Sequence, residues 1–198
     1  MKLIVGLGNP GAQYRNTRHN LGFRIVEALV ANFDAKWAKK SKLRAEVAEG
    51  RIGREKVVVI KPATFMNLSG DAVAAVSNMY KTAPEDVWIV HDDIDLAFGK
   101  VKIQRGRSSA GHRGVEHIIQ VLGTKDALRF RIGIDSRTDK QKKQDTDRFV
   151  LSAFSRDDEH TLLSLIPAIA GLIVQAIQTS PEKAMSIWGN QKKNSSHL

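Results

Sequence analysis

The chain contains no cysteine among its 198 residues. This absence excludes disulfide bonds, thiolate metal centres and a cysteine nucleophile, and it is compatible with a reducing compartment. The sequence also has no H-E-x-x-H pattern for zinc and no G-x-S-x-G turn typical of serine hydrolases. The residue types of three common kinds of catalytic site are therefore missing or not arranged in their usual patterns.

Long apolar runs are also missing. The longest apolar stretch, residues 162–177, contains Pro167 and is shorter than the ~20 residues that cross a bilayer. The apolar run at the N-terminus is too short for a signal peptide. We therefore expect a cytoplasmic protein without a membrane segment, in which residues 162–177 form a buried or interface-packed helix.

The composition is that of a globular protein, with 42% hydrophobic and 26% charged residues. We expect one domain over residues 1–189 and a disordered tail over 190–198. The polar residues 138–147 suggest a mobile segment, and 138–150 form a candidate lid. Apolar periodicity predicts strands at 2–5, 43–49, 56–61, 86–90, 100–105 and 128–134, and helices at 21–32, over a segment whose buried face runs from Ala72 to Tyr80, at 115–122 and from Ser155 onward. Asn67 or Ser69 is the expected cap of the second helix. This alternation predicts a single-domain α/β fold with a twisted mixed β-sheet flanked by α-helices.

The segment Gly6-Leu7-Gly8-Asn9-Pro10-Gly11 matches the G-x-G-x-x-G fingerprint of dinucleotide-binding proteins. That fingerprint requires a helix to begin within the glycines and a second strand that ends in an acidic residue about 20 residues later. Here the next apolar helical stripe begins at Leu21, and the second predicted strand does not begin before Leu43. An oxidoreductase with a bound dinucleotide is therefore disfavoured, and the glycines are expected to form a tight turn that presents Asn9.

The net charge of +10 is unevenly distributed. Residues 100–148 contain 13 Lys and Arg against 6 Asp and Glu, a local charge of +7, and a second basic cluster surrounds Trp37: Lys36, Lys39, Lys40, Lys42 and Arg44. A single cluster is usually a solvated surface. Two clusters of the same sign favour a polyanionic partner such as a nucleic acid.

Polar residues that could perform chemistry lie at predicted element boundaries. His19 precedes a helix, and Asn9 and Asp92 each follow a strand. Ligands of α/β proteins gather at such positions, and a carboxylate beside a histidine is the arrangement of a general base. The acidic run His91-Asp92-Asp93-Ile94-Asp95 alone could equally be a turn or a magnesium site.

At these residues the sequence resembles the bacterial peptidyl-tRNA hydrolase family. The resemblance is carried in order by GLGNPG (6–11), YRNTRHNLGFRIVE (14–27), KPATFMNLSGDAV (61–73), HDDIDLAFGK (91–100), GHRG (111–114) and RFRIGI (129–134). TRHNxG and TFMNLSG are long and uncommon strings. The resemblance therefore covers most of the chain and is far more specific than the glycine pattern.

The resemblance implies a role for individual residues. His19 resembles the base that activates water against the peptidyl ester, Asp92 resembles its orienting carboxylate, and Asn9 matches the residue that distinguishes a blocked peptidyl group from a free amino acid. The positions expected to hold the tRNA end are Tyr14, Phe65 and Asn67, those expected along the peptide path are Met66 and Asn20, and those expected on the tRNA backbone are Lys102, Arg105 and Arg131. No metal or organic cofactor and no protein partner is implied, and a monomer is expected.

One position departs from the family pattern. The family commonly has G-H-N-G where this chain has Gly111-His112-Arg113-Gly114. Arg113 can donate hydrogen bonds and carries a fixed charge, but it cannot accept a hydrogen bond as asparagine can. It could pair with a phosphate or with a developing oxyanion. The departure also leaves open an RNA-binding relative that no longer turns over its substrate, and for His112 a structural role and a substrate contact are equally compatible with the sequence.

Overall fold

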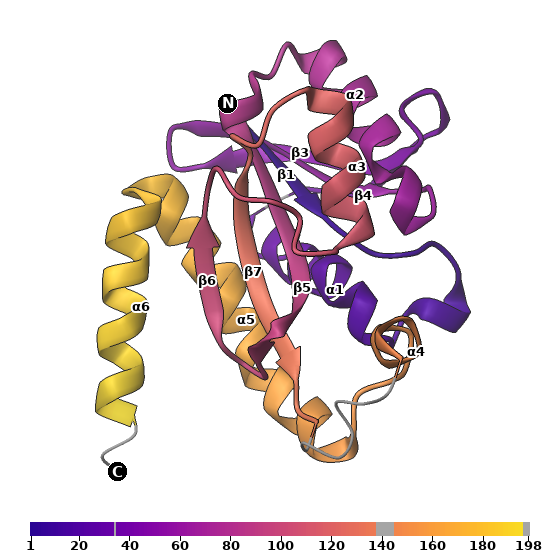
Figure 1. Ribbon diagram of the computed structural model, residues 1–198. Helices are drawn as coiled ribbons and strands as arrows, with labels where there is room; N and C mark the ends of the chain where they lie inside the picture. Colours follow the sequence, from indigo (N-terminus) through magenta and orange to yellow (C-terminus); the bar gives the residue numbers. More distant parts are fainter. Residues whose placement is uncertain (34, 138–144, 196–198) are drawn as a thin grey trace.

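The computed structural model describes residues 1–33, 35–137 and 145–195. A seven-stranded sheet forms the middle layer of the molecule, with α1 and α5 on one face and α2 and α3 on the other (Figure 1). The predicted α/β class and the mixed sheet are therefore confirmed. Residues 138–144, which include most of the segment expected to be mobile, lie outside the described residues.

The strands occur in the order β2-β3-β4-β1-β5-β7-β6 across the sheet. The central pairs β4–β1, β1–β5 and β5–β7 are parallel, and the pairs β2–β3, β3–β4 and β7–β6 are antiparallel. The strands span Lys2–Gly6 (β1), Ala38–Lys40 (β2), Ala45–Ile52 (β3), Glu55–Pro62 (β4), Val87–Ala97 (β5), Val101–Gln104 (β6) and Leu128–Asp135 (β7).

Six α-helices and five short 3-10 helices connect the strands in the described residues. The α-helices span Leu21–Val30 (α1), Ser69–Tyr80 (α2), Arg113–Leu122 (α3), Thr146–Val150 (α4), Arg156–Gln178 (α5) and Pro181–Ser195 (α6), and the 3-10 helices span Ala12–Tyr14 (η1), Arg18–Asn20 (η2), Ser41–Leu43 (η3), Met66–Leu68 (η4) and Pro84–Asp86 (η5). The side chain of Ser155 caps α5 by accepting from the N–H of Asp158, at 3.1 Å, as its position in the sequence predicts.

The two faces of the sheet have separate cores because side chains alternate along each strand. In β1, Ile4 faces α1 and α5, whereas Leu3 and Val5 face α2 and α3. Helix α5 is long and apolar enough to span a membrane by length and composition alone. Many of its apolar side chains nevertheless lie in the core between α1, α5 and the sheet, among them Leu162, Ile169 and Ile173. It is therefore better described as a core helix.

Glycines at the end of β1 and at the start of α1 permit close packing between these two elements. A Cβ atom on Gly22 would lie 2.4 Å from the carbonyl oxygen of Val90 and 2.5 Å from that of Leu7, and one on Gly6 would lie 2.7 Å from the carbonyl oxygen of Gly22. Glycine at both positions lets the start of α1 approach β1 and β5. Within the segment 6–11 only Gly11 has a positive φ, of 111°. The expected tight turn is therefore only part of the explanation for these glycines, since Gly6 serves packing.

Several predicted boundaries are wrong. Strand β5 continues through the acidic run to Ala97, because its parallel partner β7 pairs with it as far as Asp93 and again, after a register shift, at Ala97. Neither Asn67 nor Ser69 caps α2, which begins directly after η4 and has Leu68 at the N-cap position. The short exposed strand β2, which forms by antiparallel pairing to β3, precedes Leu43. Helix α6 ends at Ser195, and the expected disordered tail over 190–198 stays a prediction.

Candidate active site

The candidate site lies where β1 and β5 run side by side. Asn9 follows the carboxyl end of β1, Asp92 lies within β5, and His19 belongs to η2, which leads directly into α1. Crevices at the carboxyl ends of parallel strands are where open α/β sheets bind ligands. The fold therefore brings three of the predicted residues together at the expected edge of the sheet.

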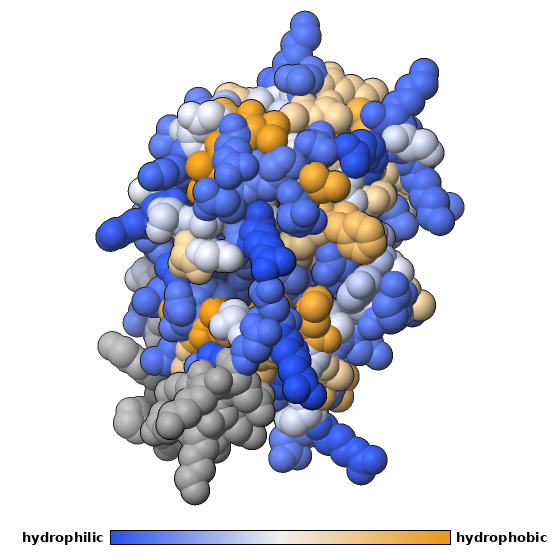
Figure 2. All heavy atoms as spheres, turned by 45° about the vertical axis from the view of Figure 1, so that its right-hand side comes forward, coloured by the Kyte–Doolittle hydropathy of each residue, from blue (hydrophilic) through white to orange (hydrophobic). Residues whose placement is uncertain are grey.

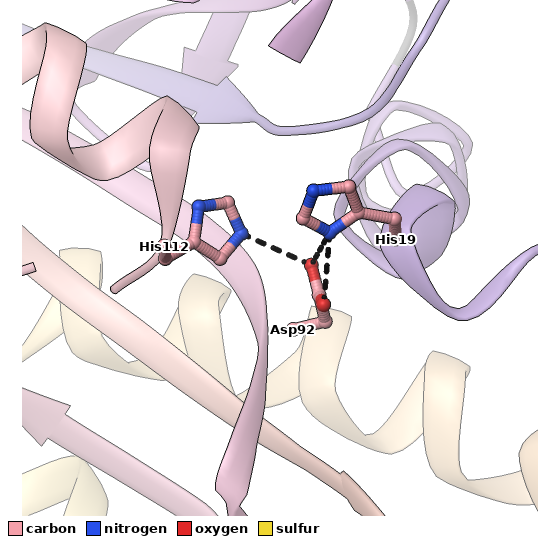
Figure 3. Close-up of side chains that lie close together, drawn as sticks. All are labelled: His19, Asp92 and His112. Carbon is pink, nitrogen blue, oxygen red and sulfur yellow. Dashed lines mark hydrogen bonds and ion pairs between the residues drawn. The ribbon is translucent and has the colours of Figure 1, made fainter. Parts of the chain in front are cut away.

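His19 and Asp92 form a close pair (Figure 3). The Nδ1 atom of His19 lies 3.0 Å from both carboxylate oxygens of Asp92. A carboxylate only accepts, so Nδ1 carries the proton, and the Nε2 atom, which is turned away from Asp92, keeps its lone pair in the neutral ring. The expected base and carboxylate are thus in contact.

His112 makes a second contact with the same carboxylate. The backbone N–H of Val115 donates to Nδ1 of His112 at 3.3 Å, at the start of α3. Neutral His112 must then carry its proton on Nε2, which donates to Oδ1 of Asp92 at 3.1 Å. His112 therefore caps α3 and orients Asp92, a role that the sequence left open.

The charges of this cluster shift its pKa values in opposite directions. Burial alone favours the neutral form of Asp92, but His19 and His112 stabilise the carboxylate and hold its pKa well below the usual range. Burial also disfavours the charged form of His19, yet the charge of Asp92 and the hydrogen bond to it outweigh burial and raise the pKa of His19. His91 is fully buried beside His112, and burial lowers its pKa well below the usual value. Asp92 is therefore a stable anion that supports a protonated His19.

Hydrogen bonds fix the position of Asn9. The backbone N–H of Asn9 donates to Oδ1 of Asn20 at 2.8 Å, and Nδ2 of Asn20 donates to the carbonyl of Asn9 at 2.9 Å. The side-chain oxygen of Asn9 accepts from the N–H of Met66 at 2.8 Å. The amide NH₂ of Asn9 is left as the group that can donate to a ligand. Both hydrogen bonds come from the side-chain amide of Asn20, and the expected place of Asn20 along the peptide path stays a prediction.

Two cavities meet at His19. One, of about 320 Å³, extends along Asp93, Asp95 and residues 109–113, and the other, of about 250 Å³, is lined by Asn9, Phe65, Met66 and Asn67. His19, Arg113, Asp147 and Val150 line both. The surrounding surface, which carries α4 and the segment after β1, is mostly hydrophilic with small separate apolar patches (Figure 2). A polar ligand could therefore reach the ring of His19 from two sides.

The ring of Phe65 lines the second cavity, and the ring of Tyr14 packs against it. The side chain of Phe65 is 55% exposed, and its ring meets that of Tyr14 edge to face, with the ring centroids 6.5 Å apart. This exposure excludes core packing as the role of Phe65. Asn67 is also exposed, whereas Met66 is buried beneath it.

The three basic residues expected on the tRNA backbone differ in how many hydrogen bonds and ion pairs their side chains make within the protein. Lys102 is exposed on β6, and no hydrogen bond or ion pair is recorded for its side chain among the described residues. Arg105 donates to the carbonyls of Glu85 and Asp126, at 2.8 and 2.7 Å. Arg131 donates to Asp93 and to Gln104, both at 2.6 Å. Arg105 and Arg131 therefore also stabilise the fold.

Lys39 and Lys40 of one basic cluster and Lys102 of the other lie at opposite edges of the sheet. Lys39 and Lys40 belong to β2, and Lys102 belongs to β6, so seven strands spaced by about 4.8 Å separate them by roughly 30 Å. One short phosphate segment cannot contact both. The clusters would instead contact separate parts of an extended polyanion.

Sequence reasoning missed Arg18 and Asp147. The guanidinium of Arg18 lies 4.3 Å from the ring centre of Phe149 and 5.0 Å from that of Phe154, and it donates to the side chain of Ser152 at 2.8 Å. These contacts hold η2, and with it His19, against the joint between α4 and α5. Asp147 pairs with Arg113 at the edge of both cavities. No local pattern distinguishes either residue from an ordinary surface charge.

Ligand atoms of His19, Asp92 and His112 lie within 4.8 Å of one another, which is close enough to share a metal ion. A metal would require lone pairs on Nδ1 of His19 and Nε2 of His112. In this structure both nitrogens face Asp92, and Nδ1 of His112 already accepts from Val115. The arrangement fits a hydrogen-bonded chain better than a metal site, and the expectation of no cofactor stays a prediction.

Comparisons with known proteins agree with the geometry. The family model described as peptidyl-tRNA hydrolase matches residues 3–196. A peptidyl-tRNA hydrolase of Aquifex aeolicus is 42% identical over 96% of this chain and 97% of its own length, and one of Thermodesulfovibrio yellowstonii is 40% identical over 95% and 98%. A crystal structure of the peptidyl-tRNA hydrolase of Acinetobacter baumannii superposes with a TM-score of 0.80 at 30% identity, covering 96% of this chain and 93% of that one. With a family model that matches nearly the whole chain, relatives aligned along their full lengths and the same fold, the chain belongs to the peptidyl-tRNA hydrolase family.

Proposed function

We propose that this protein hydrolyses the ester between a peptide, or an N-blocked aminoacyl group, and the terminal ribose of tRNA, and so recycles tRNA in the cytoplasm. The observation that carries the proposal is the orientation of His19, whose Nδ1 faces Asp92 while its Nε2 is turned away from the carboxylate. Membership of the family supports the same substrate. The protein acts as a monomer without a cofactor.

His19 acts as a general base. Its Nε2 atom removes a proton from a water molecule whose oxygen attacks the ester carbonyl carbon, and Asp92 stabilises the imidazolium that results. When the tetrahedral intermediate collapses, the C–O bond to the ribose breaks and the imidazolium returns the proton to the ribose oxygen. The products are a peptide acid and a tRNA with free terminal hydroxyls.

Asn9 supplies the selectivity for blocked substrates. Its amide NH₂ remains available because its oxygen accepts from Met66. An amide donor can bind the carbonyl of a peptide bond next to the ester, whereas a free α-ammonium group offers no acceptor. Phe65 and Tyr14 stack against the unpaired end of the tRNA, and Asn67 hydrogen-bonds to it.

The direct test compares two esters on the same tRNA. One carries an N-acetylated amino acid and the other carries the free amino acid, and release of each from the tRNA is measured over time. We expect rapid release of the acetylated amino acid alone. Tight, salt-sensitive tRNA binding without release of either would instead identify an RNA-binding relative that has lost turnover.

The pH dependence of cleavage reports on His19. A protonated imidazole cannot accept a proton, so activity is lost as the pH falls through the pKa of His19. Because Asp92 raises that pKa, we expect the acidic limb of kcat/KM to have an apparent pKa above the ordinary value of 6.5. A pH–rate profile measured from pH 5 to 9 checks this. An acidic limb below 6.5 would contradict the pairing of His19 with Asp92 as the source of the base.

Lys102→Ala is expected to weaken tRNA binding with little change in kcat. Each lost phosphate contact should lower the slope of log affinity against log salt concentration by about 1. Binding measured at several salt concentrations tests this. Lys56→Ala, at the amino end of β4 and distant from the site, is the matched control. An unchanged salt slope would remove Lys102 from the RNA-binding surface.

A further inference from the structure

We propose that Arg113 binds the 5′-phosphate of the terminal nucleotide of the substrate, and that the carboxylate of Asp147 occupies this position when no substrate is bound. The inference rests on the proposed function and assigns a specific ligand to Arg113. It concerns a residue at which this chain departs from the asparagine common in the family.

The position of Arg113 suits a ligand of the active site. Arg113 is the first residue of α3, directly after His112, and it lines both cavities that meet at His19. Its guanidinium donates through Nη2 to Oδ2 of Asp147 in α4. The structure therefore shows this guanidinium binding an anionic oxygen at the edge of the site.

Exposure distinguishes a phosphate from the reacting oxyanion as the ligand. The side chain of Arg113 is 66% exposed, whereas the side chains of His19 and Asp92 are 11% and 2% exposed. An oxyanion donor must lie within hydrogen-bond distance of the reacting carbonyl, in the part of the site that excludes water. The nearest fixed charge of the substrate is the 5′-phosphate of the same nucleotide, one ribose away from the ester. A cation at the solvent-exposed edge matches that phosphate.

The exchange of partners requires little free energy. Arg113 and Asp147 are both more than half exposed, and surface ion pairs of this kind contribute little to stability. A phosphate diester offers arginine the same bidentate acceptor geometry as a carboxylate. Substrate binding can therefore displace Asp147 without unfolding α4.

The test uses two small esters that differ only in the phosphate. One is the N-acetylaminoacyl ester of adenosine, and the other is the same ester of adenosine 5′-phosphate, capped as its methyl diester so that it carries one negative charge. The ratio of kcat/KM for the second ester over the first is measured for wild type, Arg113→Asn, Arg113→Lys and Asp147→Asn. Arg54→Asn is the matched control, since Arg54 is exposed in the β3–β4 turn at the opposite end of the sheet.

We expect wild type and Arg54→Asn to prefer the phosphate-bearing ester. Arg113→Asn should lower this preference about fivefold to tenfold, Arg113→Lys should retain most of it, and Asp147→Asn should lower KM for the phosphate-bearing ester about twofold. An unchanged ratio in Arg113→Asn, or an equal loss with both esters, would overturn the proposal, because the second result places Arg113 at the reacting atoms. If wild type cleaves neither these esters nor peptidyl-tRNA, the proposed function itself fails.

Discussion

Replacement of His19 by alanine is expected to lower kcat/KM for N-acetylaminoacyl-tRNA by about 10²- to 10⁴-fold, the usual contribution of a general base. Among the described residues, no other histidine near Asp92 could replace His19 as the base. Both ring nitrogens of His112 are hydrogen-bonded, to Asp92 and to the N–H of Val115, and His91 is fully buried. Water in the variant would therefore have no side chain positioned to take its proton. Single-turnover release of the acetylated amino acid measures the loss.

The fold of this variant should persist. Asp92 keeps its hydrogen bond from His112, and the cavity gives water access to the carboxylate after the imidazole is removed. We expect the melting temperature to fall by no more than about 2–4 °C, which corresponds to roughly 1 kcal/mol for a domain of this size. His160→Ala, an exposed histidine in α5, is the control for loss of a ring. Near-normal cleavage by a folded His19→Ala protein would refute the mechanism.

Asp92→Asn has the second largest expected effect, a decrease in kcat of about 10²- to 10⁴-fold with little change in KM. Asp92 is 2% exposed and both its oxygens face Nδ1 of His19, so we expect it to act on the reaction through His19. The asparagine amide offers one accepting oxygen where Asp92 accepts from two histidines, and it cannot stabilise an imidazolium as a carboxylate does. The loss should therefore appear in the chemical step.

The pH profile of this variant separates catalysis from simple structural damage. Without the charge of Asp92, burial of His19 is no longer outweighed, so the pKa of His19 should fall and the acidic limb of the residual activity should move to lower pH. Asp126→Asn, which keeps a hydrogen-bond partner for Thr124 at an exposed site, serves as the control. A residual profile with an unmoved acidic limb would show that Asp92 does not set the protonation of His19.

Most strands and helices could be predicted from local pattern. The continuous apolar run of 57–60 corresponds to β4, which is buried on both faces of the sheet, and the helical spacing of 115–122 corresponds to α3, which buries one face. The extent of β5 depends on a partner that is distant in sequence, because β5 reaches Ala97 where β7 lies beside it. Strand β2 forms by pairing with the nearby strand β3, but it is too short and too exposed to have an apolar pattern of its own.

The composition of the candidate site was also largely predictable. His19, Asp92, Asn9 and Asn67 follow from their positions at element boundaries and from the family strings. The hydrogen bonds and ion pairs of the site were not predictable. Asn20 is hydrogen-bonded to the backbone of Asn9, Arg131 donates to Asp93, and Asp147 forms an ion pair with Arg113. Each of these bonds joins elements whose approach is set by packing.

The sequence by itself determined the fold class, the family and the residues that can take or give a proton, because these depend on periodicity and on residue chemistry. Only the tertiary structure decided that His112 and His19 share one carboxylate, that Lys39 and Lys102 lie at opposite edges of the sheet, and that Arg113 faces the same cavities as His19. The physical reason is that hydrogen bonds and charge effects act over a few ångströms. The sheet order and close glycine contacts bring together residues such as His19 and Asp92, which are separated by 73 positions in the chain.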